Sequence, residues 1–113
     1  MGKDLLESLL SELRRGTLIL CVLSQLDKSY YGYALVQALH EKGIPVDANT
    51  LYPLLRRLEN QGLLLSEWDT SENKPRKYYK RTEYGSQIYT ELAEQWKSMA
   101  NGIWNLIGGN EDE

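Results

Sequence analysis

The chain has 113 residues, of which 42% are hydrophobic and 26% charged, and its formal net charge is −3 at pH 7. This length and composition predict one small folded domain and disfavour intrinsic disorder and low-complexity repeats. The longest uninterrupted apolar run, residues 18–23, is far shorter than the ~20 residues that a membrane-spanning helix needs. We also expect no signal peptide, because the first residues lead directly into an amphipathic, acidic pattern.

The residue types that carry most enzyme and metal chemistry are scarce. Cys21 and His40 are each the sole residue of their type, so the sequence predicts no disulfide framework and no thiol-based metal site. It also shows no glycine-rich phosphate loop and no pairing of nucleophile with base. We therefore expect no enzymatic activity, no metal and no cofactor, and a reducing cytoplasmic location.

Four helices are expected in the first half of the chain. A leucine stripe over residues 5–13 recurs at steps of three and four, which indicates one face of a short helix. Residues 17–26 are apolar almost all round and predict a buried helix, with a buried strand as the competing interpretation. A third helix is expected over 31–42, with Ser29 as its N-cap and Gly43 as its stop.

The fourth helix follows a short extended connector at residues 44–46, where Pro45 disfavours helical backbone. Leucines at i, i+3, i+4 and i+7 then continue to a helix end at Gln61. The start stays open because a proline is tolerated only where its missing N–H lacks a partner. With Pro53 so early, either Thr50 is the cap or the first turn is irregular.

The second half predicts a β-hairpin and one long helix. Residues 63–68 and 76–82 are strand formers separated by a turn-rich loop, and Tyr79 is expected to face the core. A near-heptad seam then indicates a helix over 84–107, ~36 Å long at ~1.5 Å per residue. The acidic tail 108–113 is expected to fray. The fold class is therefore mainly α with a two-stranded β wing.

Charge is distributed unevenly along the chain. Residues 84–113 have a net charge of −4, whereas residues 46–83 have +1. Within residues 74–81 five cations occur without an acid, which is typical of a nucleic-acid-binding edge. The alternative is a strand edge that lysines protect from aggregation. These cations are Lys74, Arg76, Lys77, Lys80 and Arg81.

Several motifs resemble those of the PadR family of bacterial transcription regulators. The segment from Thr50 to Glu59, followed by Gly62, resembles its recognition-helix signature. Residues 31–33 resemble the opening of its second helix, and residues 77–85 its junction between wing and last helix. The resemblance covers residues 16–107 and is closest to the short subfamily that includes multidrug-binding repressors. Arg81 and Glu83 depart from the family's usual aliphatic residue and proline.

This resemblance implies a winged helix-turn-helix over residues 1–83 and a C-terminal dimerisation helix with an acidic tail over 84–113. It implies double-stranded DNA as a partner, and the polar face left by the inward leucines of the fourth helix offers suitable side chains. A solvated face with ordinary charge pairs is the alternative. Gly32 either allows a phosphate to approach or is only a packing contact. The predicted DNA-binding residues are Tyr33, Asn49, Thr50, Tyr52, Arg56, Arg57, Lys74, Arg76, Lys77 and Lys80.

The long last helix predicts a homodimer, because its seam is longer than one small domain can cover. Two-fold symmetry would place two recognition helices ~34 Å apart and predicts a palindromic operator. A solitary helix that folds back on its own domain is the alternative. The predicted interface residues are Leu6, Leu9, Leu10, Leu92, Trp96, Met99, Ile103 and Leu106.

Trp96 and Met99 are also the predicted ligand-binding residues. In the multidrug-binding members that the chain resembles, a tryptophan at this place stacks on planar aromatic ligands, which implies a possible effector and release from DNA. Plain interfacial packing is the alternative. A homodimeric repressor is thus the predicted function, and a winged-helix protein-interaction module without DNA binding, favoured by the acidic net charge, is the competing one.

Overall fold

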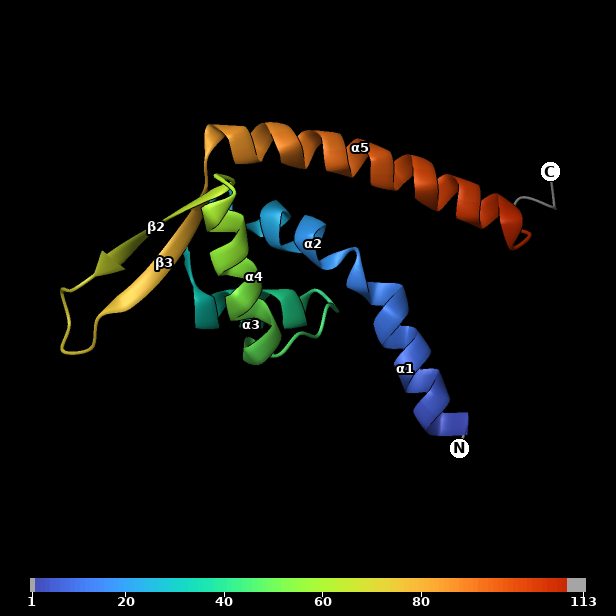
Figure 1. The fold of residues 1–113 in the computed structure, drawn as a ribbon, viewed down its shortest axis with the longest axis horizontal. Helices are drawn as coiled ribbons and strands as arrows, with labels where there is room; N and C mark the ends of the chain where they lie inside the picture. The colour runs from blue at the N-terminus through green and yellow to red at the C-terminus, as the bar shows by residue number, and fades with distance from the viewer. Residues whose placement is uncertain (1, 110–113) are drawn as a thin grey trace.

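The computed structural model describes residues 2–109 and consists of a compact head from which two helices extend (Figure 1). The helices α2, α3 and α4 and a small sheet form the head. The first and last helices leave it on the same side. The described helices are α1 (Gly2–Arg15), α2 (Leu18–Gln25), α3 (Gly32–Glu41), α4 (Ala48–Asn60) and α5 (Glu83–Leu106). The described strands are β1 (Tyr30–Tyr31), β2 (Leu64–Asp69) and β3 (Arg76–Arg81).

The head is built around a core that consists mainly of buried leucines. Each helix of the head contributes leucines to a single core, which Tyr79 completes from the sheet. The apolar segment after Gly16 is a helix, so the competing strand interpretation is wrong. The buried core residues are Val22, Leu23, Leu26, Leu35, Leu39, Leu51, Leu55, Leu58, Leu63, Leu64 and Tyr79.

The sheet has three antiparallel strands in the order β1-β3-β2, so the predicted two-stranded wing gains a third strand at its base. Tyr30 and Tyr31 of β1 pair with Tyr79 and Tyr78 of β3. Tyr79 is 4% exposed, which confirms its predicted burial. The predicted Ser29 cap is wrong: β1 occupies the residues before α3, and the extended residue Tyr31 precedes the helix without a side-chain cap.

The start of α4 resolves the question raised by Pro53. Asp47 is the N-cap, and its Oδ1 accepts a hydrogen bond of 2.9 Å from the Thr50 N–H. Thr50 is therefore already inside the helix, and Pro53 lies in the second turn. Because proline has no N–H, the helix lacks the bond to the carbonyl of Asn49, four residues earlier. Burial of Leu51 and Leu55 on either side of Pro53 offsets this loss.

The junction between β3 and α5 is tightly built. Thr82 caps α5 by accepting a 2.9 Å bond from the Gly85 N–H, and its hydroxyl donates to the Gly62 carbonyl over 2.7 Å. A Cβ on Gly85 would lie 2.0 Å from the Leu63 carbonyl oxygen. The start of α5 therefore lies directly on the chain that leads into β2, and only glycine allows this approach.

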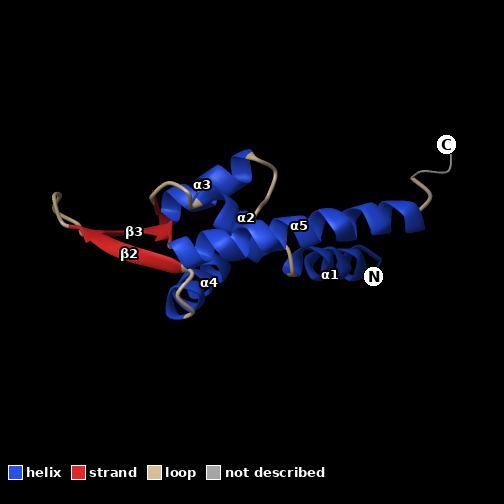
Figure 2. Cartoon of the chain, turned by 90° about the horizontal axis from the view of Figure 1, so that it is seen from above, coloured by secondary structure: helices blue, strands red, loops and turns tan. Residues whose placement is uncertain are grey.

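Beyond the head, α1 and α5 expose the apolar stripes that the sequence predicted. Leu6 and Leu9 of α1 are 56% and 53% exposed, and Ile103 near the end of α5 is 51% exposed. Figure 2 shows both helices projecting from the head on the side away from the hairpin. Among the described helices, none is long and apolar enough to cross a membrane. Most of the predicted acidic tail, residues 110–113, lies outside the described residues.

Candidate nucleic-acid interface

The helix α4 divides into a buried face and a polar face. Its leucines Leu51, Leu55 and Leu58 are fully buried, which fixes the rotation of the helix. Leucines on one side leave the predicted contact residues on the other, because the helix turns ~100° per residue. Four of these side chains are exposed on α4: Asn49, Thr50, Arg56 and Arg57.

Tyr52 differs from these four because it is half-buried against the start of α3. A Cβ on Gly32 would lie 2.2 Å from Cε1 of Tyr52, so Gly32 is a packing contact that admits the tyrosine ring. Tyr52 was predicted on the free face, and only part of it is available there. Tyr33, one residue further along α3, is 66% exposed and accepts a 3.3 Å hydrogen bond from Gln37.

The hairpin of β2 and β3 holds its predicted cations in two different ways. Lys74 and Lys80 are exposed, so their ammonium groups are available to a partner. Lys77 is half-buried, with Nζ 3.6 Å from a carboxylate oxygen of Glu59 on α4 and above the rings of Trp68 and Tyr79. Sequence reasoning missed this inward role, which depends on a carboxylate 18 residues away.

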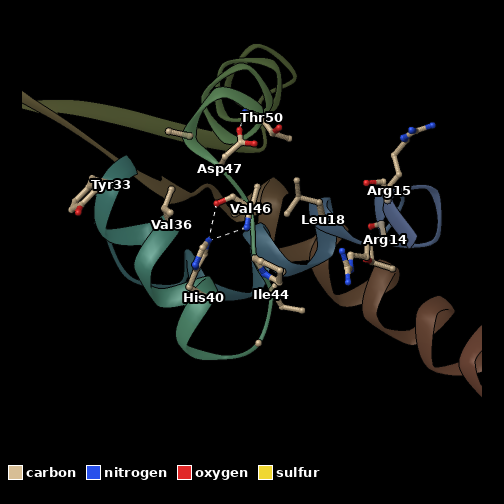
Figure 3. Close-up of a pocket in the computed structure, with 15 residues that line it drawn as sticks. Arg14, Arg15, Leu18, Tyr33, Val36, His40, Ile44, Val46, Asp47 and Thr50 are labelled. Carbon is tan, nitrogen blue, oxygen red and sulfur yellow. Dashed lines mark hydrogen bonds between the residues drawn. The ribbon is translucent and has the colours of Figure 1, made fainter. Parts of the chain in front are cut away.

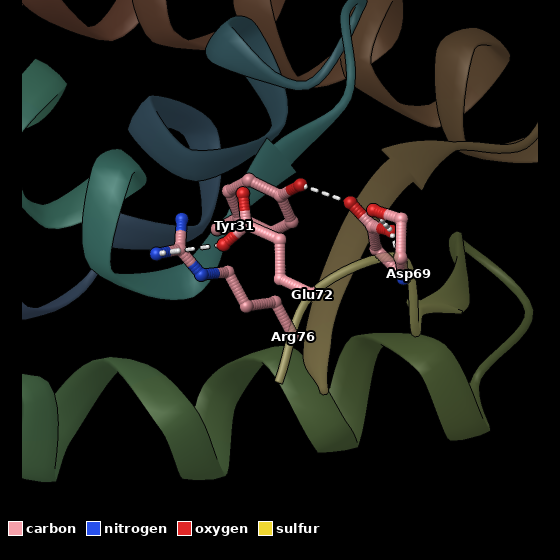
Figure 4. A network of polar contacts seen from close by, with 5 residues as sticks. Tyr31, Asp69, Glu72 and Arg76 are labelled. Atoms are coloured by element: carbon pink, nitrogen blue, oxygen red, sulfur yellow. Dashed lines mark hydrogen bonds and ion pairs between the residues drawn. The ribbon is translucent and has the colours of Figure 1, made fainter. Parts of the chain in front are cut away.

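Arg76 belongs to a polar network at the outer end of the hairpin (Figure 4). Its guanidinium lies over the ring of Tyr31 and 3.8 Å from a carboxylate oxygen of Glu72. The Tyr31 hydroxyl donates a 2.6 Å bond to Asp69, which also accepts from the hydroxyl and N–H of Ser71. These bonds connect the far end of β2 to β1, so they hold the hairpin in its direction relative to α3.

The same bonds favour the ionised carboxylate of Asp69. The Ser71 hydroxyl, followed by the Tyr31 hydroxyl, lowers the pKa of Asp69 to about 2. The Tyr31 pKa is raised, chiefly because its hydroxyl proton is held by the carboxylate. Asp69 is therefore charged at neutral pH, and Tyr31 is a neutral hydrogen-bond donor.

Arg81, counted with the basic edge in the sequence, instead connects the hairpin to the helices. Its Nη1 donates a 2.8 Å bond to the Leu23 carbonyl near the end of α2, and its Nε donates to Ser86 of α5 over 3.1 Å. The guanidinium also lies 4.6 Å from the ring centroid of Tyr89. A cation suits the C-terminal end of α2, because the helix dipole places partial negative charge there. The aliphatic residue usual in the resembled family could not make these bonds.

An open groove of about 880 Å³ runs between the α1–α2 junction and the α3–α4 connector (Figure 3). Apolar side chains such as Val36 and Ile44 form its walls, and Arg14 and Arg15 stand at the end opposite Tyr33. His40 fixes the connector, because its Nε2 lies 3.0 Å from the Val46 carbonyl oxygen and 3.1 Å from the Val46 nitrogen.

No group of three or more His, Cys, Asp or Glu side chains within residues 2–109 is placed to hold a metal ion. Cys21 is half-buried in α2, and burial raises the pKa of its thiol.

A helix-turn-helix (α3 and α4) followed by a β-hairpin defines the winged-helix class of regulators. The chain belongs to the transcriptional regulator PadR-like family, whose family model matches residues 19–91. This confirms the resemblance and the predicted fold class. A transcriptional regulator from Mycobacterium tuberculosis is 36% identical over 83 residues, which cover 74% of this chain and 75% of the relative.

Solved structures agree with this assignment. A PadR family transcriptional regulator from Eggerthella lenta is 52% identical, with a TM-score of 0.88 over 96% of this chain and 97% of that one. PadR from Bacillus subtilis, whose structure was solved in complex with operator DNA, is 21% identical with a TM-score of 0.63. It covers 68% of this chain, which spans 45% of that one, and at this identity the likeness shows the fold alone.

Proposed function

We propose that the protein is a homodimeric transcriptional repressor that binds a palindromic DNA operator and acts in the cytoplasm. The observation that carries this proposal is the exposed polar face of α4 beside a cationic hairpin. Membership of a family of transcriptional regulators supports it. It also argues against the competing interpretation, a protein-interaction module without DNA binding.

In this proposal the exposed face of α4 enters the major groove. Arginine can contact guanine through two hydrogen bonds and asparagine can contact adenine in the same way, which suits Arg56, Arg57 and Asn49. Thr50, in the first turn, would donate its hydroxyl to a phosphate. Tyr33, exposed at the start of α3, would contact the backbone beside the groove.

The hairpin would follow the backbone or enter the adjacent minor groove. Lys74 and Lys80 are free to do so, whereas Arg76 must first leave Glu72. The distance of 3.8 Å between exposed groups makes that ion pair weak, so a phosphate can replace the carboxylate. Lys77 contributes mainly by fixing the hairpin to α4 through Glu59.

We propose that α1 and α5 form the dimer interface. Leu92, Trp96, Met99, Ile103 and Leu106 on α5 are all 37% or more exposed, which is too much contiguous apolar surface for an isolated chain. On α1, Leu6 and Leu9 are exposed and Leu10 is half-buried. In this proposal the exposed apolar faces of α1 and α5 pack against the α5 of a second copy. The proposed division is therefore a DNA-binding part, residues 1–83, and a dimerisation part, residues 84–113.

A planar aromatic effector is the remaining part of the proposal. Trp96 is 45% exposed and Met99 61% exposed, so both side chains would face the dimer interface, where a flat ligand could stack. Release from DNA would require the ligand to favour a dimer whose two α4 helices no longer match the operator spacing.

The DNA-binding proposal is tested by selecting duplexes from a random pool with the purified protein and footprinting the result. The variant R56A/R57A should lose footprinted binding and still sediment as a dimer. The matched control K28A/K42A removes two exposed cations away from α4 and should bind normally. A normal footprint from R56A/R57A would refute the assigned role, and failure of the parent to select any duplex would favour the protein-interaction module.

The effector proposal is tested with planar aromatic dyes that change fluorescence on stacking. The parent should bind them with quenching of tryptophan fluorescence, and Trp96→Ala should reduce the affinity at least tenfold. Trp68→Ala, which removes an indole that is 62% exposed on the hairpin, serves as the control. Equal dye binding by Trp96→Ala and the parent would place any pocket elsewhere.

A further inference from the structure

A second cationic surface lies on the opposite flank of α4 from the hairpin. On the hairpin side, Glu59 accepts a hydrogen bond from Ser66 of β2 and pairs with Lys77. On the other side, a small hollow between α4 and the α1–α2 junction is lined by Thr50 and Arg57 of α4 and by Arg15. Thr50 also lines the larger groove, together with Arg14 and Arg15.

Helical geometry places the hairpin contact of Glu59 and the hollow lined by Thr50 and Arg57 on opposite sides of the exposed face of α4. At ~100° per residue, Thr50 and Arg57 lie ~20° apart around α4, whereas Glu59 lies ~180° from Thr50. Asn49 and Arg56 project between these two directions, on the side away from the buried leucines. Figure 1 shows α4 between the hairpin and the end of α1, so these two elements border its exposed face.

The three arginines on this flank are free of carboxylates. Within residues 2–109, neither Arg14, Arg15 nor Arg57 forms an ion pair, and all three are exposed. Among the residues that line the groove, the acidic one is Asp47, whose carboxylate caps α4. By contrast, the hairpin cations Arg76 and Lys77 both have carboxylate partners.

The geometry of duplex DNA suggests what the surface formed by Arg14, Arg15 and Arg57 binds. The major groove is ~12 Å wide and is bordered by a phosphate backbone on each side, so a helix inside it has phosphates along both flanks. The hairpin can contact only the backbone on its own side of α4. We propose that Arg14 and Arg15, together with Arg57, bind the phosphate backbone on the other side.

This inference rests on the proposed function, since it requires α4 to lie in the major groove. It adds a binding surface that the sequence did not indicate, because Arg14 and Arg15 are followed by a helix break and belong to no motif. In this inference α1 has two roles: its leucines contact the second subunit, and its C-terminal end contacts DNA. Arginine suits the second role, because it offers several donors to phosphate oxygens.

The test compares R14Q/R15Q with R14K/R15K on a duplex selected by the parent. Each phosphate contact adds ~0.9 to the slope of log K against log salt concentration, so loss of both arginines should make the slope shallower by ~1.8 per subunit and ~3.6 per dimer. The lysine variant retains the charges and should keep most of the slope. The ratio of affinities for the selected and a scrambled duplex should change less than threefold.

The control K28Q/K42Q removes the same charge from exposed positions outside both the groove and the hollow, and should leave the slope unchanged. Sedimentation verifies that each variant keeps the parent's oligomeric state. If R14Q/R15Q does not keep it, the single variant Arg15→Gln replaces the double variant in the test. A parent-like slope for R14Q/R15Q overturns the inference while leaving the proposed function intact. A parent with no salt-dependent duplex binding overturns the proposed function itself.

Discussion

Gly85→Ala tests how closely α5 is attached to the head. The new Cβ would lie 2.0 Å from the carbonyl oxygen of Leu63 and 2.9 Å from its carbonyl carbon. These atoms cannot move aside easily, because the Leu63 N–H donates to Leu58 over 2.9 Å and the carbonyl accepts from Thr82 over 3.1 Å. The substitution must therefore displace the start of α5.

The expected cost follows from the bonds that such a displacement strains. Overpacking of a tight contact costs ~1–3 kcal/mol, and weakening of the Thr82 cap costs ~1 kcal/mol more. The better helix propensity of alanine offsets at most ~1 kcal/mol of this loss in stability. We expect Gly85→Ala to lower the free energy of unfolding by about 2 kcal/mol, which corresponds to a fall in Tm of roughly 6–12 °C.

Urea denaturation followed by circular dichroism measures this loss, with the protein concentration held constant because dimers unfold in a concentration-dependent way. The matched control is Gly16→Ala, where the added Cβ has no neighbour within 4 Å and the backbone φ is not positive. This control should be neutral or stabilised by up to ~1 kcal/mol, through the entropy of the unfolded chain. A Gly85→Ala variant as stable as the parent would refute the close approach.

Three further predictions concern the head. Arg81→Leu should lower the free energy of unfolding by ~1–2 kcal/mol, because the charge-assisted hydrogen bond to the Leu23 carbonyl is lost. A change in the salt dependence of DNA binding by this variant would show instead that the Arg81 guanidinium contacts phosphate. Gly32→Ala should lower the free energy of unfolding by ~1–3 kcal/mol, because the new Cβ would meet the Tyr52 ring. In a double-mutant cycle, Tyr52→Ala should restore part of this loss, and strictly additive effects of the two substitutions would contradict the contact. Asp69 has its pKa lowered to about 2, so its contribution to stability is present above its unfolded pKa near 3.8 and is lost as the pH falls towards 2. Asp69→Asn should therefore flatten the decline in stability between pH 4 and 2, and an unchanged decline would show that the bonds from Ser71 and Tyr31 to this carboxylate have no energetic effect.

The sequence predicted the helices well because their leucines repeat with the helical period. Burial of Leu51, Leu55 and Leu58 is a local pattern, and it fixes which face of α4 is left polar without reference to any other element. The predicted burial of Tyr79 followed from strand alternation in the same way. Such features need only the order of residues within one segment.

Features that depend on two segments meeting were missed. The strand β1 has only two residues, and pairing with β3 makes it a strand, so its own sequence gives no period to detect. Lys77 and Arg81 read as members of a cationic edge, yet their partners are Glu59 on α4 and a carbonyl of α2. Charge in a linear pattern indicates a surface, whereas the direction of each side chain depends on the tertiary fold.

One residue, Thr82, separates the end of β3 from the start of α5, and hydrogen bonds hold it from both sides. The hairpin and the long helix are therefore joined through a single hydrogen-bonded residue. A change in the direction of α5 at this residue would therefore also change the direction of the hairpin. Because α5 extends far beyond the head, a contact at its distant end would act on this junction through a long lever arm.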